Sequence, residues 1–286
     1  MAQKLSGRAA VITGGGDGIG RAVAFAMAAE GAKVVVNDIG KDPQGNRMAD
    51  KVVEEIKKAG GTAVANHDSV ATLAGGQSII KTAVSNFGRI DILVNCAGNY
   101  ALGTIEDITE ENWDSVIAVH LKGHFSCIQA AVKEMIKQKY GRIINMSSSA
   151  AFMFLPGVSR SIAYPAAKAA IMGLTATLSA NLKQHGITVN AILPDAVTKL
   201  FPFPTVLGAA NKIRKGPEYV APTIVYLATE EARNVTGQYI YSCAGELCIF
   251  NRPFQVPGPH TFAQKDGQWT VDELARIIPQ MLGQEP

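Results

Sequence analysis

Cysteine is scarce in this chain, and the few cysteines are not arranged in pairs. The four are Cys96, Cys127, Cys243 and Cys248, with no C-x-x-C spacing and no paired histidine spacing to accompany them. Structural zinc sites and disulfide frameworks both need regularly spaced ligands or cysteines. We therefore predict no metal site, and reduced thiols in a cytoplasmic protein.

The chain also lacks long apolar runs and blocks of one charge. No stretch of about 18 uncharged apolar residues occurs, so no membrane span is expected, and the apolar run near the N-terminus is too short for a signal peptide. Lys and Arg number 27 against 24 Asp and Glu, and they are spread along the chain. Nucleic-acid binding is not indicated, because it needs a clustered basic surface. The expected partner is a small-molecule substrate.

What the sequence does contain is an alternation of short β-rich runs and longer helical patterns. The predicted strands cover 9–13, 33–37, 62–66, 91–95, 142–146, 188–193 and 238–242. They are apolar at consecutive positions, which suits burial on both faces of a sheet. In the segment 48–60, Val52, Val53 and Ile56 share one helical face. This alternation predicts an α/β fold with a doubly wound parallel sheet, the Rossmann fold.

Two stretches depart from the alternation. Residues 194–217 are too long for a plain turn, and long loops in compact domains are often binding loops. Residues 251–268 are rich in Pro and Gly and lead to a segment in which Thr270 and Glu273 have capping-box spacing. We predict a single Rossmann-type domain over 1–250, with a substrate loop at 194–217, and a C-terminal extension over 251–286 with one short helix.

A glycine-rich turn, TGGGDGIG at 13–20, follows the first predicted strand. Gly14, Gly18 and Gly20 have G-x-x-x-G-x-G spacing where a strand meets a helix. A pyrophosphate can lie there against backbone N–H groups at the positive end of the helix, and side chains would block its approach. Together with Asp17 and Ile19, these glycines are predicted to bind a dinucleotide cofactor.

Asp38, at the end of the second predicted strand, is the residue expected to select the dinucleotide. It lies eighteen positions after Gly20, where a carboxylate accepts hydrogen bonds from ribose hydroxyls and repels a 2′-phosphate. The glycine turn offers no Arg or Lys to hold such a phosphate, so we predict NAD as the cofactor. Lys41 leaves NADP as an alternative, and a purely structural alternative is that Asp38 only starts a turn.

Ser148, Tyr164 and Lys168 form a second group of candidate residues. Tyr164 and Lys168 are four positions apart on a predicted helix, so both side chains point the same way. An ammonium group and a positive nicotinamide ring favour the phenolate and are expected to lower the tyrosine pKa from its ordinary value near 10. Tyr164 is then a general base for an alcohol proton, and Ser148, just after the fifth strand, hydrogen-bonds the substrate oxygen.

These motifs resemble those of one enzyme family. TGGGDGIG, NCAG (95–98), MSSS (146–149) and YPAAK (164–168) are similar to the motif set of short-chain dehydrogenases/reductases, over residues 5–245. Segments such as VVVNDIG, FGRIDILVN and VHLKGHF resemble, more narrowly, the (3R)-hydroxyacyl-CoA dehydrogenase domain of peroxisomal multifunctional enzyme type 2 and its bacterial stand-alone relatives. The resemblance implies hydride transfer between NAD and a secondary alcohol or ketone by a homo-oligomer, either a dimer or a tetramer.

The resemblance also implies further site residues. Cofactor contacts, besides those of Tyr164 and Lys168, would come from Asp68 and Ser69 beside the adenine, from Asn95, Ala97 and Gly98 along the cofactor, and from Val197 and Thr198 at the carboxamide. His120 stands where the family usually has Asn, whose main-chain carbonyl holds a relay water leading to the lysine. We group His120 with the catalytic residues, as a relay or structural residue. Asp195 replaces a common glycine, and CAGELCIF lacks the usual double glycine.

The substrate is the least determined part of the prediction. Phe152, Met153, Phe154, Leu155, Phe201 and Phe203 either line a pocket for a lipophilic substrate or pack the loops. Arg160, Lys212, Arg214 and Lys215 either meet the phosphates of coenzyme A or lie on the solvated surface. The expected substrate is a 3-hydroxyacyl-CoA-like, steroid-like or aromatic alcohol. The alternative is a catalytically inactive NAD-binding subunit of a hetero-oligomeric dehydrogenase, which His120 and Asp195 favour and the complete set of Ser148, Tyr164 and Lys168 opposes.

Overall fold

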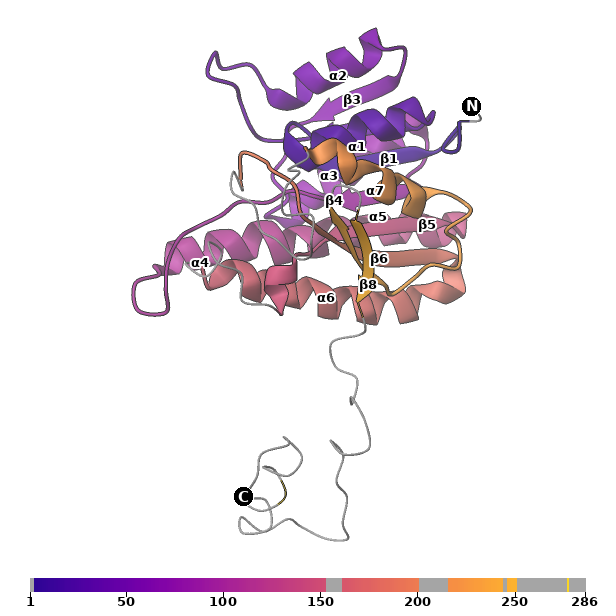
Figure 1. The fold of residues 1–286 in the computed structure, drawn as a ribbon. Helices are drawn as coiled ribbons and strands as arrows, with labels where there is room; N and C mark the ends of the chain where they lie inside the picture. The colour runs from indigo at the N-terminus through magenta and orange to yellow at the C-terminus, as the bar shows by residue number, and fades with distance from the viewer. Residues whose placement is uncertain (1–2, 153–160, 201–215, 244–245, 251–276, 278–286) are drawn as a thin grey trace. The chain divides into compact units, whose positions relative to one another are not determined.

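The strands of the chain form one sheet in the computed structural model (Figure 1), which describes residues 3–152, 161–200, 216–243, 246–250 and 277. The strands are β1 (Ala9–Thr13), β2 (Lys33–Asn37), β3 (Thr62–Asn66), β4 (Ile92–Asn95), β5 (Gly141–Met146), β6 (Ile187–Pro194), β7 (Tyr239–Cys243) and β8 (Glu246–Phe250). The α-helices are α1 (Gly18–Ala29), α2 (Met48–Lys58), α3 (Leu73–Phe87), α4 (Glu110–Ile117), α5 (Gly123–Gln138), α6 (Ala163–Leu182) and α7 (Ala221–Ala228). A π-helical turn, η1 (Ala118–Lys122), joins α4 to α5, and three 3₁₀ turns are η2 (Ser149–Ala151), η3 (Lys183–His185) and η4 (Pro217–Tyr219).

The strand order within the described residues is β3-β2-β1-β4-β5-β6-β7-β8. Strands β1 to β7 pair in parallel, and β8 joins β7 in the antiparallel sense. The order reverses between β1 and β4, and ligands of open α/β sheets bind at the carboxyl ends of the strands beside such a switch point. The predicted doubly wound sheet is confirmed, and each of the seven predicted strands is found within one residue of its predicted ends.

The sheet carries a hydrophobic core on each of its two faces. Ala10 and Ile12 of β1 belong to a cluster that includes residues of α1, α2 and α7, whereas Val11 belongs to a cluster with residues of α3 and α5. Every residue of β1 is buried, which is why its apolar side chains are consecutive and not alternate. The predicted apolar face of α2, with Val52 and Ile56, is buried as well.

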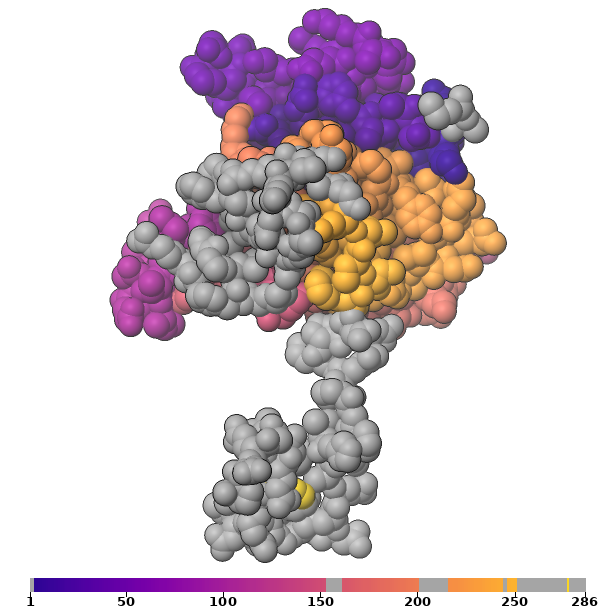
Figure 2. All heavy atoms as spheres, viewed as in Figure 1, coloured from indigo at the N-terminus to yellow at the C-terminus, as the bar shows by residue number. Residues whose placement is uncertain are grey.

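Strand β8 is an addition that the sequence patterns do not predict. It follows β7 closely and forms the edge of the sheet, where its yellow atoms are visible on the surface in Figure 2. Leu247 and Ile249 are 66% and 61% exposed, so the strand has no buried face. Its sequence, ELCIF, has consecutive apolar residues like the predicted strands, but at the edge of the sheet Leu247 and Ile249 remain exposed.

Two compact units, Met1–Phe250 and Asn251–Pro286, divide the chain by its contacts. The short helix predicted in the C-terminal extension falls almost entirely outside the described residues, so the domain assignment stays a prediction. Among the helices that the structure describes, none combines the length and the apolar character needed to cross a membrane.

Candidate active site

The glycine-rich turn between β1 and α1 has the tight geometry that its spacing predicts. Gly14 and Gly18 have φ angles of 65° and 52°, which favour glycine over other residues. A Cβ on Gly20 would lie 2.1 Å from the Gly14 carbonyl oxygen, so no side chain fits there. The Asp17 carboxylate caps α1 by accepting a hydrogen bond from the Gly18 N–H at 2.9 Å. The turn therefore brings the N-terminus of α1 to the carboxyl edge of the sheet.

Asp38 follows β2 and turns its carboxylate toward the glycine turn. Its Oδ2 accepts from the Gly16 N–H at 2.9 Å, and its Oδ1 accepts from the Gly40 N–H at 2.7 Å. A Cβ on Gly16 would lie 2.8 Å from Oδ2, so the glycine permits this close approach. Because each carboxylate oxygen has two lone pairs, Asp38 retains acceptor capacity toward the cavity that it lines.

Thr13 ties the carboxyl end of β4 to that of β1. Its Oγ1 accepts hydrogen bonds from the Cys96 and Ala97 N–H groups, at 3.0 and 3.1 Å. A Cβ on Gly14 would lie 2.8 Å from the Ala97 Cα. The NCAG segment therefore packs directly against the glycine turn, which explains why two motifs distant in sequence meet at one site.

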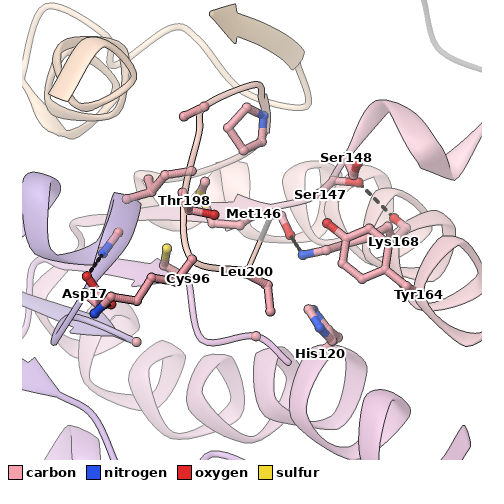
Figure 3. Close-up of a pocket in the computed structure, with 18 of the residues that line it drawn as sticks. Asp17, Cys96, His120, Met146, Ser147, Ser148, Tyr164, Lys168, Thr198 and Leu200 are labelled. Carbon is pink, nitrogen blue, oxygen red and sulfur yellow. Dashed lines mark hydrogen bonds and ion pairs between the residues drawn. The ribbon is translucent and has the colours of Figure 1, made fainter. Parts of the chain in front are cut away.

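Tyr164 and Lys168 lie one turn apart near the start of α6 and border the same cavity (Figure 3). Both side chains are buried. Ser148, which caps η2 after β5, makes a side-chain hydrogen bond with Tyr164. Lys168 Nζ donates to the Met146 carbonyl at 2.5 Å, and Ser147 Oγ donates to the Lys168 carbonyl at 2.9 Å. The end of β5 thus holds both the ammonium group and its helix.

Burial shifts the pKa values of these two groups in opposite directions. It raises the pKa of Tyr164, and the hydrogen bond with Ser148 opposes that shift without reversing it. Burial lowers the pKa of Lys168 to about 8. Desolvation of the phenolate is the largest influence on the Tyr164 pKa, and the lowering expected from Lys168 together with a nicotinamide ring stays a prediction.

His120 lies in η1 with its ring against that of Tyr164, at 5.3 Å between centroids and 89° between planes. Its Nε2 lies 2.8 Å from the Asn99 carbonyl oxygen and also 3.2 Å from the Asn99 backbone N–H, which can donate to it. Burial, and then the charge of Lys168, hold the pKa of His120 well below its usual value, and the ring is neutral. A Cβ on Gly98 would lie 2.8 Å from its Cε1, so the last glycine of NCAG makes room for the ring.

The segment after β6 crosses the glycine turn. Lys199 Nζ pairs with the Asp17 carboxylate at 2.6 Å, and Thr198 comes within 3.6 Å of the position that a Cβ on Gly18 would take. Burial raises the pKa of Asp17, but the hydrogen bonds from Lys199 and the Gly18 N–H together outweigh burial and lower it. The described residues at the start of the segment after β6 therefore contribute to the site.

Together these elements enclose a cavity of about 410 Å³. The predicted residues that line it are Gly14, Asp17, Gly18, Ile19, Gly20, Asp38, Gly98, His120, Ser148, Tyr164, Lys168 and Thr198. Pro194, Asp195, Ala196, Lys199 and Leu200, which also line it, belong to the segment 194–217 predicted as a substrate loop. The remaining lining residues, not named as site residues from the sequence, are Cys96, Met146 and Ser147. Figure 3 shows Asp17 at one end of this cavity and Tyr164, Lys168 and Ser148 at the other.

The other predicted cofactor residues, Asp68, Ser69, Asn95, Ala97 and Val197, do not line the cavity. The Asp68 carboxylate accepts from Asn66 Nδ2 at 2.9 Å and from Ser78 Oγ at 2.7 Å, which organises the end of β3. Asn95 Nδ2 donates to Asn145 Oδ1 at 3.0 Å beneath the site. The cofactor contacts assigned to these five residues stay predictions.

Most of the predicted substrate residues fall outside the described residues. They are Met153, Phe154, Leu155, Arg160, Phe201, Phe203, Lys212, Arg214 and Lys215. Phe152 is described, but it packs edge-on against Phe250 with ring centroids 5.1 Å apart and does not line the cavity. Of the two predicted roles, Phe152 therefore has the packing role, against Phe250.

Comparison with known proteins agrees with this geometry. Residues 8–200 match the family described as short chain dehydrogenase. The chain belongs to the short-chain dehydrogenase family. A crystal structure of a short chain dehydrogenase from Mycobacterium avium superimposes with a TM-score of 0.85 at 40% sequence identity, covering 99% of this chain and 97% of that one.

Curated relatives of this short-chain dehydrogenase include both long and short proteins. It is 41% identical over 248 residues to the peroxisomal multifunctional enzyme type 2 of Drosophila melanogaster, spanning 85% of this chain but only 40% of that enzyme. It is 40% identical over 237 residues to a putative short-chain type dehydrogenase/reductase of Mycobacterium tuberculosis, of which it spans 81%. It is 41% identical over 252 residues to a 3-oxoacyl-[acyl-carrier-protein] reductase of Synechocystis sp., spanning 86% of this chain and 99% of that one.

The cavity of this short-chain dehydrogenase fits a nicotinamide dinucleotide. The cavity is lined by the glycine turn, in which no side chain fits at Gly20. The turn leads into the N-terminus of α1, where a pyrophosphate is stabilised. Asp38, which could hold a ribose, lines this cavity together with Tyr164 and Lys168. The residues present therefore suit the nicotinamide cofactors on which this family depends.

Proposed function

We propose that this short-chain dehydrogenase transfers a hydride between NAD and a secondary alcohol or ketone, with Tyr164 as the proton-transferring residue. The observation that carries the proposal is that Tyr164 and Lys168 line the same cavity as the glycine turn and Asp38. A proton-transferring group and a dinucleotide site are the two parts that alcohol oxidation needs, and here one cavity contains both.

Each side chain has a role that its contacts support. Ser148, within hydrogen-bonding reach of the Tyr164 hydroxyl, positions the substrate oxygen beside it. In oxidation Tyr164 takes the alcohol proton, and in reduction it returns that proton to the carbonyl oxygen. Lys168, with Nζ 5.4 Å from the centre of the tyrosine ring, stabilises the phenolate by its charge. The nicotinamide ring, when bound, supplies the hydride acceptor or donor.

The choice of NAD over NADP rests on Asp38. Its carboxylate is fixed by the Gly16 and Gly40 N–H groups, so it cannot easily turn away from a ribose at this position. A 2′-phosphate on that ribose would meet a negative charge. Lys41, the residue that favours NADP in the sequence, does not line the cavity.

The expected substrate is a 3-hydroxyacyl thioester or the corresponding 3-oxoacyl thioester. The relative from Synechocystis sp., which this chain matches over nearly its whole length, is named for reduction of a 3-oxoacyl group. The multifunctional enzymes type 2 of Drosophila melanogaster and Mus musculus match this chain over 40% and 32% of their length, so their complete activities do not transfer. A steroid-like or aromatic secondary alcohol is the alternative substrate.

A substrate and cofactor panel tests the proposal. The purified chain would be mixed with NAD or NADP and with 3-hydroxyacyl-CoA thioesters of several lengths, a hydroxysteroid or an aromatic secondary alcohol, and the absorbance of the reduced nicotinamide followed. We expect turnover with NAD, and the highest kcat/KM with a 3-hydroxyacyl-CoA. Nucleotide binding without turnover of any alcohol or ketone would favour the inactive subunit instead.

Two further assignments accompany this proposal. A homo-oligomer is expected from the family resemblance, and size-exclusion chromatography with light scattering would establish its size. The cytoplasmic location stays a prediction, and the fly and mouse relatives are named as peroxisomal proteins.

A further inference from the structure

The ring of Tyr164 has two aromatic neighbours among the described residues. The Tyr100 ring lies 5.5 Å away between centroids, at 63° between planes, and the His120 ring lies 5.3 Å away at 89°. Both contacts are edge-on, an arrangement that aromatic pairs prefer and that contributes about 0.5–1.5 kcal/mol beyond the area buried. Tyr100 lies two positions after Gly98, the last residue of NCAG, and is not among the site residues predicted from the sequence.

The other buried packing around Tyr164 is made of small side chains. The buried members of its hydrophobic cluster, besides Tyr164 itself, are Val116, Ala150, Ala163 and Ala167. Alanine and valine have few side-chain atoms to contact a ring, and dispersion attraction adds up over the contacting atoms. The aromatic neighbours therefore provide a large share of the attraction that holds the Tyr164 ring in place.

The segment that carries Tyr100, residues 99–108, is fixed at its start by His120. The Asn99 N–H and the Asn99 carbonyl oxygen lie 3.2 and 2.8 Å from His120 Nε2, so either neutral tautomer of the ring makes one hydrogen bond with the Asn99 backbone. Asn99 Nδ2 also donates to Ser115 Oγ of α4 at 2.8 Å. The residue before Tyr100 is therefore attached to the same imidazole that packs against Tyr164.

Further along, the segment 99–108 contacts the start of α6. The Gly103 carbonyl oxygen accepts from the N–H of Ile162, the N-cap of α6, at 3.2 Å. A Cβ on Gly103 would lie 2.6 Å from the Ile108 Cβ, so glycine allows this close path, and Ile108 packs against the cluster of Tyr164. The segment therefore supports the first turn of α6 through its backbone as well as through the Tyr100 ring.

Proton transfer is sensitive to small displacements of the Tyr164 hydroxyl. A general base acts within about 2.6–3.2 Å of the group that gives up the proton, and a misplacement of about 1 Å can cost about a hundredfold in rate. The hydroxyl lies at the far end of the ring, so a tilt of the ring about the Cα–Cβ bond moves it further than any other atom of the side chain. Contacts that prevent such a tilt therefore matter for the rate.

We propose that Tyr100 is a positioning residue, which holds the Tyr164 ring by its edge-on contact and so fixes the Tyr164 hydroxyl at the place where the substrate oxygen binds. This inference rests on the proposed function. Tyr100 does not line the cavity, so its effect on the reaction passes through Tyr164 and not through contact with the substrate.

Tyr100 also has an electrostatic effect on Tyr164. Burial is the main cause that raises the pKa of Tyr164, the hydrogen bond with Ser148 opposes it, and the charge of Tyr100 raises it further. Removing the Tyr100 hydroxyl should therefore lower the pKa of Tyr164. The rise of alcohol oxidation with pH should then begin at a lower pH.

Two variants of Tyr100 separate the ring contact from the hydroxyl. Tyr100→Phe keeps the ring and removes the hydroxyl, whereas Tyr100→Leu removes the ring. The matched control is Tyr226→Leu, which changes a tyrosine of α7 that is 48% exposed. Readouts are kcat and KM for oxidation across the pH range, the dissociation constant for NAD, and the melting temperature, which shows that each variant is folded.

We expect Tyr100→Leu to lower kcat by about tenfold, less than the hundredfold cost of a full 1 Å misplacement, because the contact with His120 remains. KM and the dissociation constant for NAD should change little. Tyr100→Phe should keep most of the turnover and shift the pH profile of oxidation to lower pH, and Tyr226→Leu should change none of these values.

Three results would overturn the proposal. The first is a Tyr100→Leu variant with the kcat of the unmodified chain. The second is a raised KM with unchanged kcat in that variant, which is the sign of a residue that binds the substrate directly. The third is an equal loss of kcat in Tyr100→Leu and Tyr100→Phe, because the hydroxyl and not the ring would then be responsible.

Crystal structures of the unmodified chain and of Tyr100→Leu give a test that does not depend on turnover. The proposal predicts one position of the Tyr164 ring in the unmodified chain, and a tilted or divided position in the variant. An unmoved Tyr164 ring in the variant would overturn the proposal even in an active enzyme. A displaced ring in a chain that turns over no alcohol or ketone would instead count against the proposed function alone.

Discussion

The glycine turn and the catalytic group meet at one cavity but are built differently. The turn between β1 and α1 is made of backbone, and Asp17 and Asp38 beside it are held by N–H groups. The group on α6 consists of ionisable side chains, and Tyr164 and Lys168 are only 6% and 4% exposed. The comparison teaches that the glycine turn depends on steric room, whereas the proton transfer proposed for α6 would depend on buried charge, which costs stability.

The largest expected effect separates proton transfer from cofactor binding. Tyr164→Phe removes the acid–base hydroxyl without changing the ring, so kcat for oxidation should fall by at least about a hundredfold. The dissociation constant for NAD, measured by calorimetry, should stay nearly the same. Tyr226→Phe, which alters an exposed tyrosine on α7, is the matched control. Wild-type turnover in Tyr164→Phe would refute the assignment of the base.

The next effect concerns the stability cost of the buried ammonium group. Burial lowers the pKa of Lys168 to about 8 in the folded protein, whereas the ordinary pKa of a lysine is 10.5. Below pH 8 this difference destabilises the folded state by about 3 kcal/mol, and the cost disappears as pH rises toward 10.5. Lys168→Met should therefore raise the free energy of unfolding at pH 7 while turnover is lost.

Urea denaturation of Lys168→Met at pH 7 and at pH 10 measures this cost. The advantage of the variant over the unmodified chain should be large at pH 7 and small at pH 10. A variant that is less stable than the unmodified chain at pH 7 would show that the hydrogen bond to Met146 outweighs desolvation.

A smaller effect is expected at the cofactor end. Asp38→Ala removes a charged acceptor, and hydrogen bonds to charged groups contribute about 1.5–3 kcal/mol. NAD binding should therefore weaken by about tenfold or more, while NADP binding weakens less or improves. Asp38→Asn, which keeps the shape and removes the charge, is the matched variant. If calorimetry shows that Asp38→Ala weakens the binding of NAD and NADP equally, Asp38 does not discriminate between the two cofactors at the ribose.

The smallest effect is expected for the ion pair above the turn. Lys199 and Asp17 have side chains 80% and 47% exposed, and such surface pairs contribute at most about 1 kcal/mol. Lys199→Met should change the dissociation constant for NAD by less than about fivefold, and added salt should remove the difference. A much larger loss would mean that Lys199 binds the cofactor itself.

Much of the fold can be predicted because its signals are local. Consecutive apolar residues predict strands buried on both faces, and β1, β5 and β6 are buried along nearly their whole length. Strand β8 is not predicted, although its sequence ELCIF also has consecutive apolar residues; Leu247 and Ile249 face solvent in the structure. The π-helical turn η1 escapes as well, since the sequence VHLKG has no feature that separates a π-helical turn from an ordinary helix.

The candidate site divides in the same way. The glycine turn is predictable because only glycine leaves room for a tight turn between a strand and a helix. The four-residue spacing of Tyr164 and Lys168 predicts that both lie on the same face of a helix. The direction of the Tyr164 pKa shift is not predictable, because it depends on how completely neighbouring elements exclude water. The contact of His124 with the His120 carbonyl and the pairing of Lys199 with Asp17 depend on side-chain positions that a sequence does not specify.

The most direct test of the account is a crystal structure of the chain with bound NAD. The account predicts the pyrophosphate on the glycine turn at Gly14 to Gly20, the adenosine ribose at Asp38, and the nicotinamide ring within reach of Tyr164 and Lys168. A nicotinamide bound remote from the Tyr164 hydroxyl, or a dinucleotide that leaves the glycine turn unused, would contradict it.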